Sequence, residues 1–165
     1  ILIFRRTKLG VDKLEQTLSK NGYKVENLHG DKSQNDRKTA LGKFKKNYVK
    51  ILIATDLAAR GIDVKELDAV VNFDLPNLPD TYVHRIGRTG RAGKMGMAYS
   101  FCSADEKEYV KNIQQSIHVQ IPVVEDHPYP LDPKAKPEIH KKKTGSKHKK
   151  GRKGAGSKKK KKRWY

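Results

Sequence analysis

Cysteine is nearly absent from this chain of 165 residues, and so are long apolar runs. The single cysteine, Cys102, excludes an internal disulfide framework and any zinc site built from several cysteines, and it fits a reducing, intracellular setting. The longest uninterrupted apolar runs, 1–4 and 51–54, hold four residues each, whereas a membrane-spanning helix needs about 20. We therefore do not expect an integral membrane protein.

A charged and then apolar leader with a cleavage site is also missing, so secretion is not expected. The chain starts at Ile1, without methionine and inside a strand-like run, so we expect it to be a piece of a longer protein. Acidic residues are scarce at the other end. Residues 134–165 hold 16 Lys/Arg and a single acid, and residues 1–133 hold 21 Lys/Arg and 17 Asp/Glu. The net charge of +19 thus divides into +15 and +4.

Apolar segments alternate with amphipathic ones along the first 133 residues. The apolar segments predict strands at 1–4, 23–29, 50–54, 69–73 and 97–102, with a further edge strand at 119–124, where Pro122 excludes a central position. Prolines from position 128 onward end the folded structure. Buried strands that alternate with helices indicate an α/β fold, with a parallel sheet and helices on both faces.

Helical spacing links these strands. Val11, Leu14 and Leu18 predict a helix that ends at Gly22. Ser33 is expected to cap a helix whose buried face carries Ala40, Leu41 and Phe44. Asp80 is expected to cap a short helix that ends at residue 86, and residues 105–116 are expected to form another helix. Ligands of such sheets bind at the carboxyl ends of the strands, where the loops 5–8, 56–63 and 74–76 fall.

The string from His84 to Gly93 concentrates arginines between glycines. Arg88 and Arg91 present planar forks that suit phosphate oxygens, although a solvated basic loop is equally compatible with the composition. The glycine spacing excludes a dinucleotide-binding fingerprint. A P-loop is excluded because nowhere does a Gly-Lys pair precede Ser or Thr at the required spacing.

Two further segments combine groups that suit a nucleic acid. In the segment 54–63, Thr55 and Arg60 are suited to bind a phosphate backbone, and Asp63 is suited to accept from a sugar hydroxyl. The alternative is that Asp56 and Asp63 simply cap turns. In the segment 34–37, Gln34 and Arg37 share one face at a helix N-terminus, which favours the binding of anions. The alternative is that they belong to an exposed polar first turn without a ligand.

Taken in order, these segments resemble the motifs of the C-terminal RecA-like domain of DEAD-box RNA helicases. The matching stretches are 1–8 (motif IV), 34–37 (the Q-x-x-R element), 55–63 (motif V), 71–76 (motif Va) and 84–91 (motif VI). The resemblance covers residues 1–133, and the stretch 126–131 with the basic tail resembles the bacterial RhlE-type subgroup. It implies a RecA-like domain, truncated at its N-terminus, of an enzyme that remodels short RNA duplexes by ATP-driven closure of two such domains.

The resemblance also implies roles for single residues. Arg88 and Arg91 would be arginine fingers on ATP, with Asp63 on the ribose. Asp74 would help hold the loops of motifs V and VI, while His84 and Arg85 would couple the ATP site to the RNA site and to the partner domain. The residues implied to grip RNA are Arg6, Gly30, Gln34, Arg37, Thr55 and Arg60.

Arg5 departs from the family pattern, because many members carry a smaller residue there. We expect it either to add a phosphate contact or to be exposed. The chain also lacks the Walker A and Asp-Glu-Ala-Asp motifs, which lie in the first RecA-like domain of the family. That domain is the implied partner and would hold Mg²⁺ and most of the ATP, so this chain alone is predicted to be inactive. No metal site is expected within it.

The segment 134–165 is low-complexity, rich in Lys, Gly and Ser, and is predicted to be a disordered tail. Its charge predicts sequence-independent RNA binding, although a solubility tail is an alternative. Two hypotheses for the function of the chain remain. It is either a part of a cytoplasmic ATP-dependent RNA helicase or an ATP-independent RNA-binding or annealing module. The sequence upstream of Ile1 would distinguish them.

Overall fold

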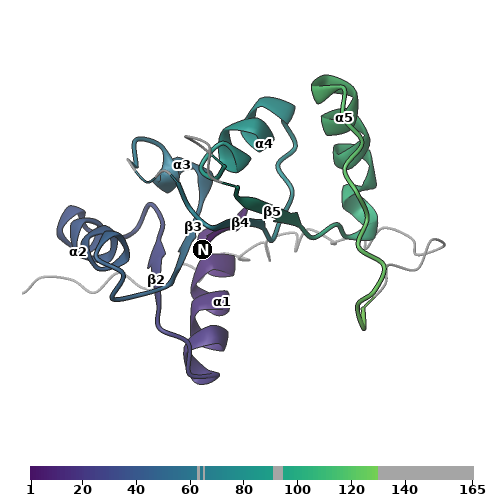
Figure 1. Ribbon diagram of the computed structural model, residues 1–165. Helices are drawn as coiled ribbons and strands as arrows, with labels where there is room; N and C mark the ends of the chain where they lie inside the picture. The colour runs from purple at the N-terminus through teal and green to yellow at the C-terminus, as the bar shows by residue number, and fades with distance from the viewer. Residues whose placement is uncertain (63, 65, 91–94, 130–165) are drawn as a thin grey trace, which may run out of the picture.

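Residues 1–62, 64, 66–90 and 95–129 are described by a computed structural model, and they hold a five-stranded sheet. All neighbouring strands pair in parallel, in the order β2-β3-β1-β4-β5 (Figure 1). The strands are β1 (Leu2–Phe4), β2 (Val25–Leu28), β3 (Ile51–Ala54), β4 (Ala69–Asn72) and β5 (Met97–Ser100). The five strands expected over residues 1–102 are confirmed. The tail at 134–165 lies outside the described residues.

The first strand of the chain lies in the middle of the sheet. Leu2 is in register with Leu52 of β3 on one side and with Val70 of β4 on the other. Both faces of β1 are covered, so all three of its residues are buried and apolar. Arg5 and Arg6 follow directly, at the carboxyl edge of the sheet.

Helices cover both faces, as predicted. On one face, α1 (Lys8–Lys20) packs Val11 against Ile3 and Ile53. On the other, Ala40 and Phe44 of α2 (Gln34–Lys45) share a core with the helix α3 (Asp56–Ala59) and with alternate residues of the strands. Figure 1 shows α1 below the sheet and α3 above it.

The helix ends follow local chemistry. Thr7 caps α1 by accepting from the Gly10 backbone N–H, and Ser33 caps α2 by accepting from that of Asp36, so the predicted Ser33 cap is confirmed. After α1 the chain turns at Gly22, whose φ of 83° favours glycine.

Two helix boundaries differ from the prediction. The helix α4 (Pro79–Ile86) is preceded by Leu78 as its N-cap, so the expected cap at Asp80 is wrong. Pro79 occupies the first position, where its missing N–H is not needed, and this moves the start ahead of Asp80. The helix expected at 105–116 is divided into a 3₁₀ turn, η1 (Ala104–Glu106), and α5 (Lys107–Ile117).

The edge strand expected at 119–124 is also wrong, because this segment has no regular secondary structure and pairs with no strand of the described sheet. Pro122 has no N–H to donate, and the backbone N–H of Ile121 donates to the side-chain oxygen of Gln114, 2.8 Å away, rather than to a strand.

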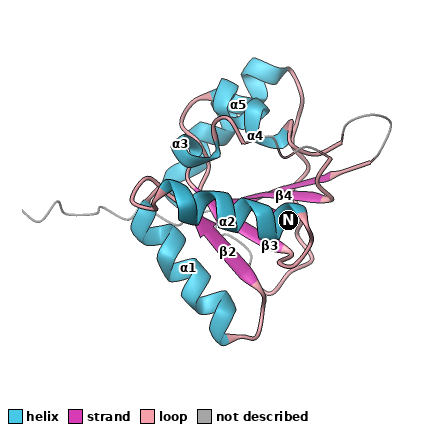
Figure 2. Cartoon of the chain, turned by 90° about the vertical axis from the view of Figure 1, so that its left-hand side faces the viewer, coloured by secondary structure: helices cyan, strands magenta, loops and turns pink. Residues whose placement is uncertain are grey.

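The remaining helices form a third apolar cluster, in which Leu75, Tyr82 and Ile113 are buried. Figure 2 shows α3, α4 and α5 gathered above the sheet. Among the helices in the described residues, none is long and apolar enough to cross a membrane.

Candidate functional site

Most predicted site residues lie at or near the carboxyl edge of the sheet. Arg6 follows β1, Thr55 follows β3, Asp74 follows β4 and Gly30 follows β2. Parallel strands bring these loops to one edge, so residues far apart in sequence become neighbours. The helices α2 and α4 add Arg37 at the start of one and Arg85 at the end of the other.

Arg85 is the central residue of this edge. Its side chain is 3% exposed, and its Nε and Nη2 donate to Oδ1 and Oδ2 of Asp56, each at 2.7 Å. Its Nη1 donates to Asn72 Oδ1 at 3.0 Å and to the Asp74 carbonyl at 2.7 Å. The guanidinium also lies over the Phe4 ring, 4.8 Å from its centroid. Arg85 therefore joins the ends of β3, β4 and α4 within this domain.

The Asp74 carboxylate binds the two arginines that follow β1. Its Oδ1 accepts from Arg5 Nη1 at 3.1 Å and its Oδ2 from the Arg6 backbone N–H at 2.7 Å. The carboxylate therefore holds the motif IV segment, and only the Asp74 carbonyl, through Arg85, contacts the motif VI helix. That Asp74 helps to hold the motif V and VI loops stays a prediction.

Arg5 is turned inward. Its side chain is only 20% exposed, and its guanidinium carbon lies 4.3 Å from the centroid of the Phe73 ring. The expectation of an exposed side chain is wrong, since Asp74 and Phe73 offer a charge and a ring to the guanidinium. The alternative, a direct phosphate contact, finds no support in this arrangement.

Glu106 and Asn72 belong to the site but were missed from the sequence. Glu106 Oε1 accepts from Arg6 Nη2 at 2.5 Å and from the Leu75 backbone N–H at 3.1 Å, although the residue is only 5% exposed. The Ser103-x-x-Glu106 spacing signals the capping box found at η1, but no sequence signal predicts the contact with Arg6. Asn72 is fully buried between Arg85 and Ser100.

The residues predicted to grip phosphates surround α3. Arg37 donates from Nη2 to the Ala58 carbonyl at 3.2 Å, which ties α2 to α3. Thr55 is the buried N-cap of α3, and Arg60 is its exposed C-cap. Gln34 is exposed in the first turn of α2.

Gly30 lies beside Lys8. A Cβ atom at Gly30 would lie 3.4 Å from Lys8 Cε, so the lysine stem passes close to this backbone. Lys8 Nζ also forms an ion pair with Asp31, and this hydrogen bond holds the pKa of the Asp31 carboxyl below its ordinary value. The loop after β2 therefore brings a lysine close to an exposed glycine.

The motif VI string continues past α4. Arg88 donates from Nη1 to the Ile62 carbonyl at 3.0 Å, so this arginine lies against the loop that follows α3. His84 is exposed in the last turn of α4. Arg91 and Asp63 lie outside the described residues.

A cavity of about 290 Å³ opens among these groups. It is lined by Arg6, Asp56, Leu75, Pro76, Asn77, Arg85 and Tyr109. Arg6 also lies over the Tyr109 ring, 5.6 Å from the centroid. Within the described residues no group of three or more His, Cys, Asp or Glu side chains could hold a metal ion.

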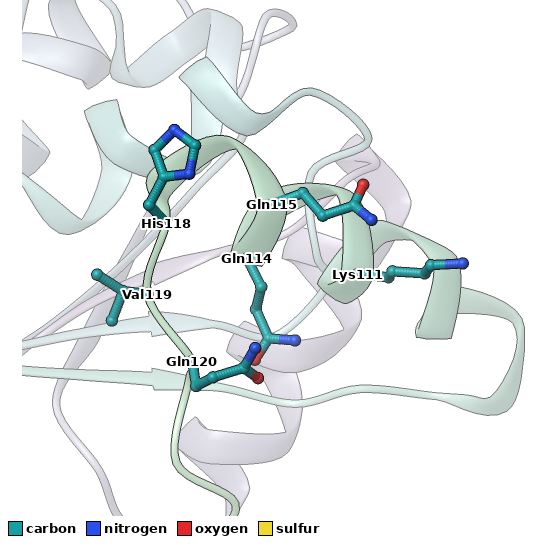
Figure 3. Close-up of a pocket in the computed structure, with 6 residues that line it drawn as sticks. All are labelled: Lys111, Gln114, Gln115, His118, Val119 and Gln120. Carbon is teal, nitrogen blue, oxygen red and sulfur yellow. The ribbon is translucent and has the colours of Figure 1, made fainter.

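A larger hollow of about 390 Å³ lies at the end of α5 (Figure 3). It is lined by Lys111, Gln114, Gln115, His118, Val119 and Gln120, which come from α5 and the segment that follows it. None of the predicted site residues lines it, so it is separate from the edge described above.

Comparison with known proteins gives concordant matches. The family described as "Helicase conserved C-terminal domain" matches residues 1–93. The DEAD-box ATP-dependent RNA helicase CshA of Bacillus licheniformis is 50% identical over 115 residues, which are 70% of this chain and 24% of the relative. The chain thus spans about a quarter of the length of the curated relatives it matches. The expected RhlE-type subgroup stays a prediction.

Solved structures agree with the sequence matches. A DEAD box protein from Methanococcus jannaschii has a TM-score of 0.68 at 42% identity, covering 72% of this chain and 32% of that one. The Escherichia coli DEAD-box protein SrmB, solved bound to the regulator of ribonuclease activity A, also has a TM-score of 0.68, at 36% identity, covering 74% and 71%. The sheet and helices described above are therefore those of RecA-like DEAD-box C-terminal domains.

Proposed function

Because this chain belongs to the family of helicase conserved C-terminal domains, in the form that DEAD-box proteins carry, we propose that it is the second RecA-like half of an ATP-dependent RNA helicase. Paired with a first RecA-like domain, it would unwind or remodel short RNA duplexes. The proposed folded domain spans residues 1–133.

The observation that carries this proposal is the tie between two loops. Arg85 clamps Asp56 at the start of α3, and Arg88 donates to the Ile62 carbonyl just after α3. The segment that would grip RNA and the string that would reach ATP are thus parts of one connected edge. A strand held by one loop can therefore affect how the arginines of the other are presented.

In the proposed mechanism, Arg88 and Arg91 reach the γ-phosphate of ATP that is bound mainly by the first domain. Asp63 contacts the ribose. Phosphoryl transfer depends on positioning and charge stabilisation, and an arginine finger can be worth roughly 10³–10⁵ in rate. Fingers supplied across a cleft make hydrolysis depend on domain closure.

The RNA strand would lie over α3 and the N-terminus of α2. Arg37 and Arg60, with the Thr55 hydroxyl, would bind successive phosphates, and Gln34, Gly30 and Arg6 would extend the contact. Such contacts go to the backbone and carry little sequence information. A strand bent by closure of the two domains would separate from its complement.

His84, Arg85 and Asp74 would contribute in different ways to coupling between the ATP site, the RNA site and the first domain. The exposed His84 is free to meet the first domain. Arg85 and Asp74 act inside this domain, because their polar atoms are engaged by Asp56, Asn72, Arg5 and Arg6. They would transmit closure by keeping the loops in one arrangement.

ATP is accordingly the proposed substrate, with Mg²⁺ held by the first domain. Residues 134–165 are proposed as a basic tail that holds RNA, and the cytoplasm is the proposed location. The alternative of an ATP-independent annealing module is not favoured, because the curated relatives carry the name of ATP-dependent helicases.

The test is Arg88→Ala in the protein joined to its first RecA-like domain. RNA-stimulated ATP turnover should fall by roughly 10³-fold or more, with RNA affinity nearly unchanged. Lys38→Ala, an exposed change on α2, serves as the control. Unchanged turnover in Arg88→Ala would refute the assignment of Arg88 as an arginine finger. Strong ATP turnover by the isolated 165-residue chain would refute the proposal that the first domain is needed for ATP hydrolysis.

A further inference from the structure

Arg5 occupies a site formed by three elements. It follows β1, its Nη1 binds Asp74 after β4, and its guanidinium packs against the first turn of α1. A Cβ atom at Gly10 would lie 2.8 Å from Arg5 Nη2 and 2.9 Å from its Nε. Only a residue without a side chain leaves this space, so Gly10 makes room for Arg5.

The two faces of the sheet explain why Arg5 and Arg6 differ. Side chains alternate along an extended chain, so Arg5 follows Ile3 toward the α1 face, and Arg6 follows Phe4 toward the opposite face. On the α1 face Arg5 lies over Phe73. On the other face Arg6 reaches Leu75 and Glu106 and lines the 290 Å³ cavity.

Asp74 links the two arginines across the edge of the sheet. One carboxylate oxygen binds the Arg5 guanidinium, and the other binds the Arg6 backbone N–H at 2.7 Å. With Arg5 in place, the carboxylate has one orientation that satisfies both partners. Without Arg5, Oδ1 loses its partner, and the anion is free to turn toward the Arg6 guanidinium.

We propose that Arg5 is a positioning residue. It keeps Asp74 on the Arg6 backbone N–H, so that the Arg6 guanidinium stays on Leu75 and Glu106 at the RNA-binding edge, and Gly10 is the residue that permits this. Arg5 itself does not contact RNA, because its own guanidinium is enclosed by Asp74, Phe73 and Gly10. The inference rests on the proposed function in one respect, namely that Arg6 contacts an RNA phosphate.

A double-mutant cycle on the whole 165-residue chain separates these claims. The probe is a short fluorescein-labelled oligouridylate, and the readouts are Kd and its salt dependence. The basic tail is the same in every variant, so differences report the folded edge. Arg6→Met should raise Kd roughly tenfold and lower the salt slope by about 0.7, the share of one phosphate contact on a single strand.

Arg5→Met should raise Kd roughly three- to tenfold and lower the salt slope similarly, but should have no further effect in the Arg6→Met background. Arg5→Lys should resemble Arg5→Met, because an ammonium keeps the charge but cannot lie flat on Phe73 while one of its nitrogens reaches Asp74, as the guanidinium does. A loss of fold stability alone would not change the salt slope. Gly10→Ala should weaken binding when Arg5 is present and have a smaller effect in Arg5→Met, where only the Thr7 hydroxyl, 2.9 Å from the added Cβ, still has to move.

The outcomes are distinct. If Arg6→Met leaves Kd unchanged, the proposed phosphate contact fails, and the inference fails with it. If Arg6→Met weakens binding but Arg5→Met does not, only the positioning role fails. Equal effects of Arg5→Met with and without Arg6, or full binding by Arg5→Lys, would mean that Arg5 acts directly through its charge, which also overturns the inference.

Discussion

The Arg85 guanidinium and the Asp56 carboxylate form a two-point pair, with both hydrogen bonds at 2.7 Å. Arg85 is almost completely buried, while the Asp56 side chain is 36% exposed. A buried arginine whose partner reaches solvent has little freedom to reorient, because the remaining space around it is filled by Asn72, Phe4 and the Asp74 carbonyl.

Arg85→Met should destabilise the fold. It leaves Asn72 and Asp56 without their partner, and removal of one member of a buried ion pair costs about 3–5 kcal/mol, reduced here to about 2–4 kcal/mol because Asp56 is partly solvated. Urea unfolding followed by circular dichroism measures the change. Arg60→Met, at an exposed position, should stay within about 0.5 kcal/mol of the parent. Equal effects of the two changes would contradict the clamp.

Two glycines should respond in opposite directions to alanine. A Cβ atom at Gly96 would lie 1.8 Å from Thr89 Oγ1 and 2.5 Å from the Gly90 backbone nitrogen, whereas one at Gly42, inside α2, meets nothing within 4 Å. Gly96→Ala should cost about 1–3 kcal/mol or more, and Gly42→Ala should add about 0.4–1 kcal/mol to the free energy of unfolding. Thermal unfolding of both variants gives the comparison, and a stabilised Gly96→Ala would show that Thr89 is not packed against this backbone.

Cys102 offers a pH-dependent probe of the folded state. Burial, and next the nearby Glu106 charge, raise the pKa of the Cys102 thiol above its ordinary value. At a given alkaline pH the folded chain therefore holds less thiolate than the unfolded chain, and the thiolate is the reactive form. The pH profile of iodoacetamide alkylation should shift upward in the native chain relative to the chain in guanidinium chloride. Identical midpoints would contradict the raised pKa of this partly buried thiol.

Deletion of the residues after Pro133 should separate affinity from chemistry. The removed segment carries a net charge of +15, so RNA affinity should fall and its salt dependence should flatten, by about 0.7 in slope for each phosphate that the tail neutralises. In the protein joined to its first domain, ATP turnover at saturating RNA should stay nearly unchanged. Binding isotherms at several salt concentrations provide the measurement, and an unaltered salt slope would show that the tail does not engage RNA.

Much of the fold could be predicted because the buried strands carry unbroken apolar runs. In 1–4 and 51–54 the side chains on both faces are apolar, which is typical of central parallel strands. The 119–124 segment is also largely apolar but finds no neighbour, since Pro122 and the Ile121–Gln114 bond remove donors from a ladder. Composition alone does not reveal whether a partner strand is within reach.

The sequence offers candidate residues for the site, but it does not predict which of them contact one another. Arg85 and Arg88 stand three residues apart in one string, and the sequence does not tell which is buried. The helix decides it, because Arg85 lies one turn after Tyr82, on the face of α4 that is directed into the core. The partners of Asp74 and the role of Glu106 depend on contacts between segments 68 and 100 residues apart, which no local pattern predicts.

The central position of β1 constrains how the protein is made. Its two neighbours, β3 and β4, follow it by about 50 and 68 residues, as the pairs Leu2–Leu52 and Leu2–Val70 show. Contacts so distant in sequence slow folding, because the entropy cost of closing the long loops comes before the strand pairs can stabilise the chain. During synthesis the first strand leaves the ribosome long before either partner exists. One side of β1 can pair with β3 once Ala54 has emerged, but the other side stays unpaired until Asn72 has been added and has cleared the exit tunnel.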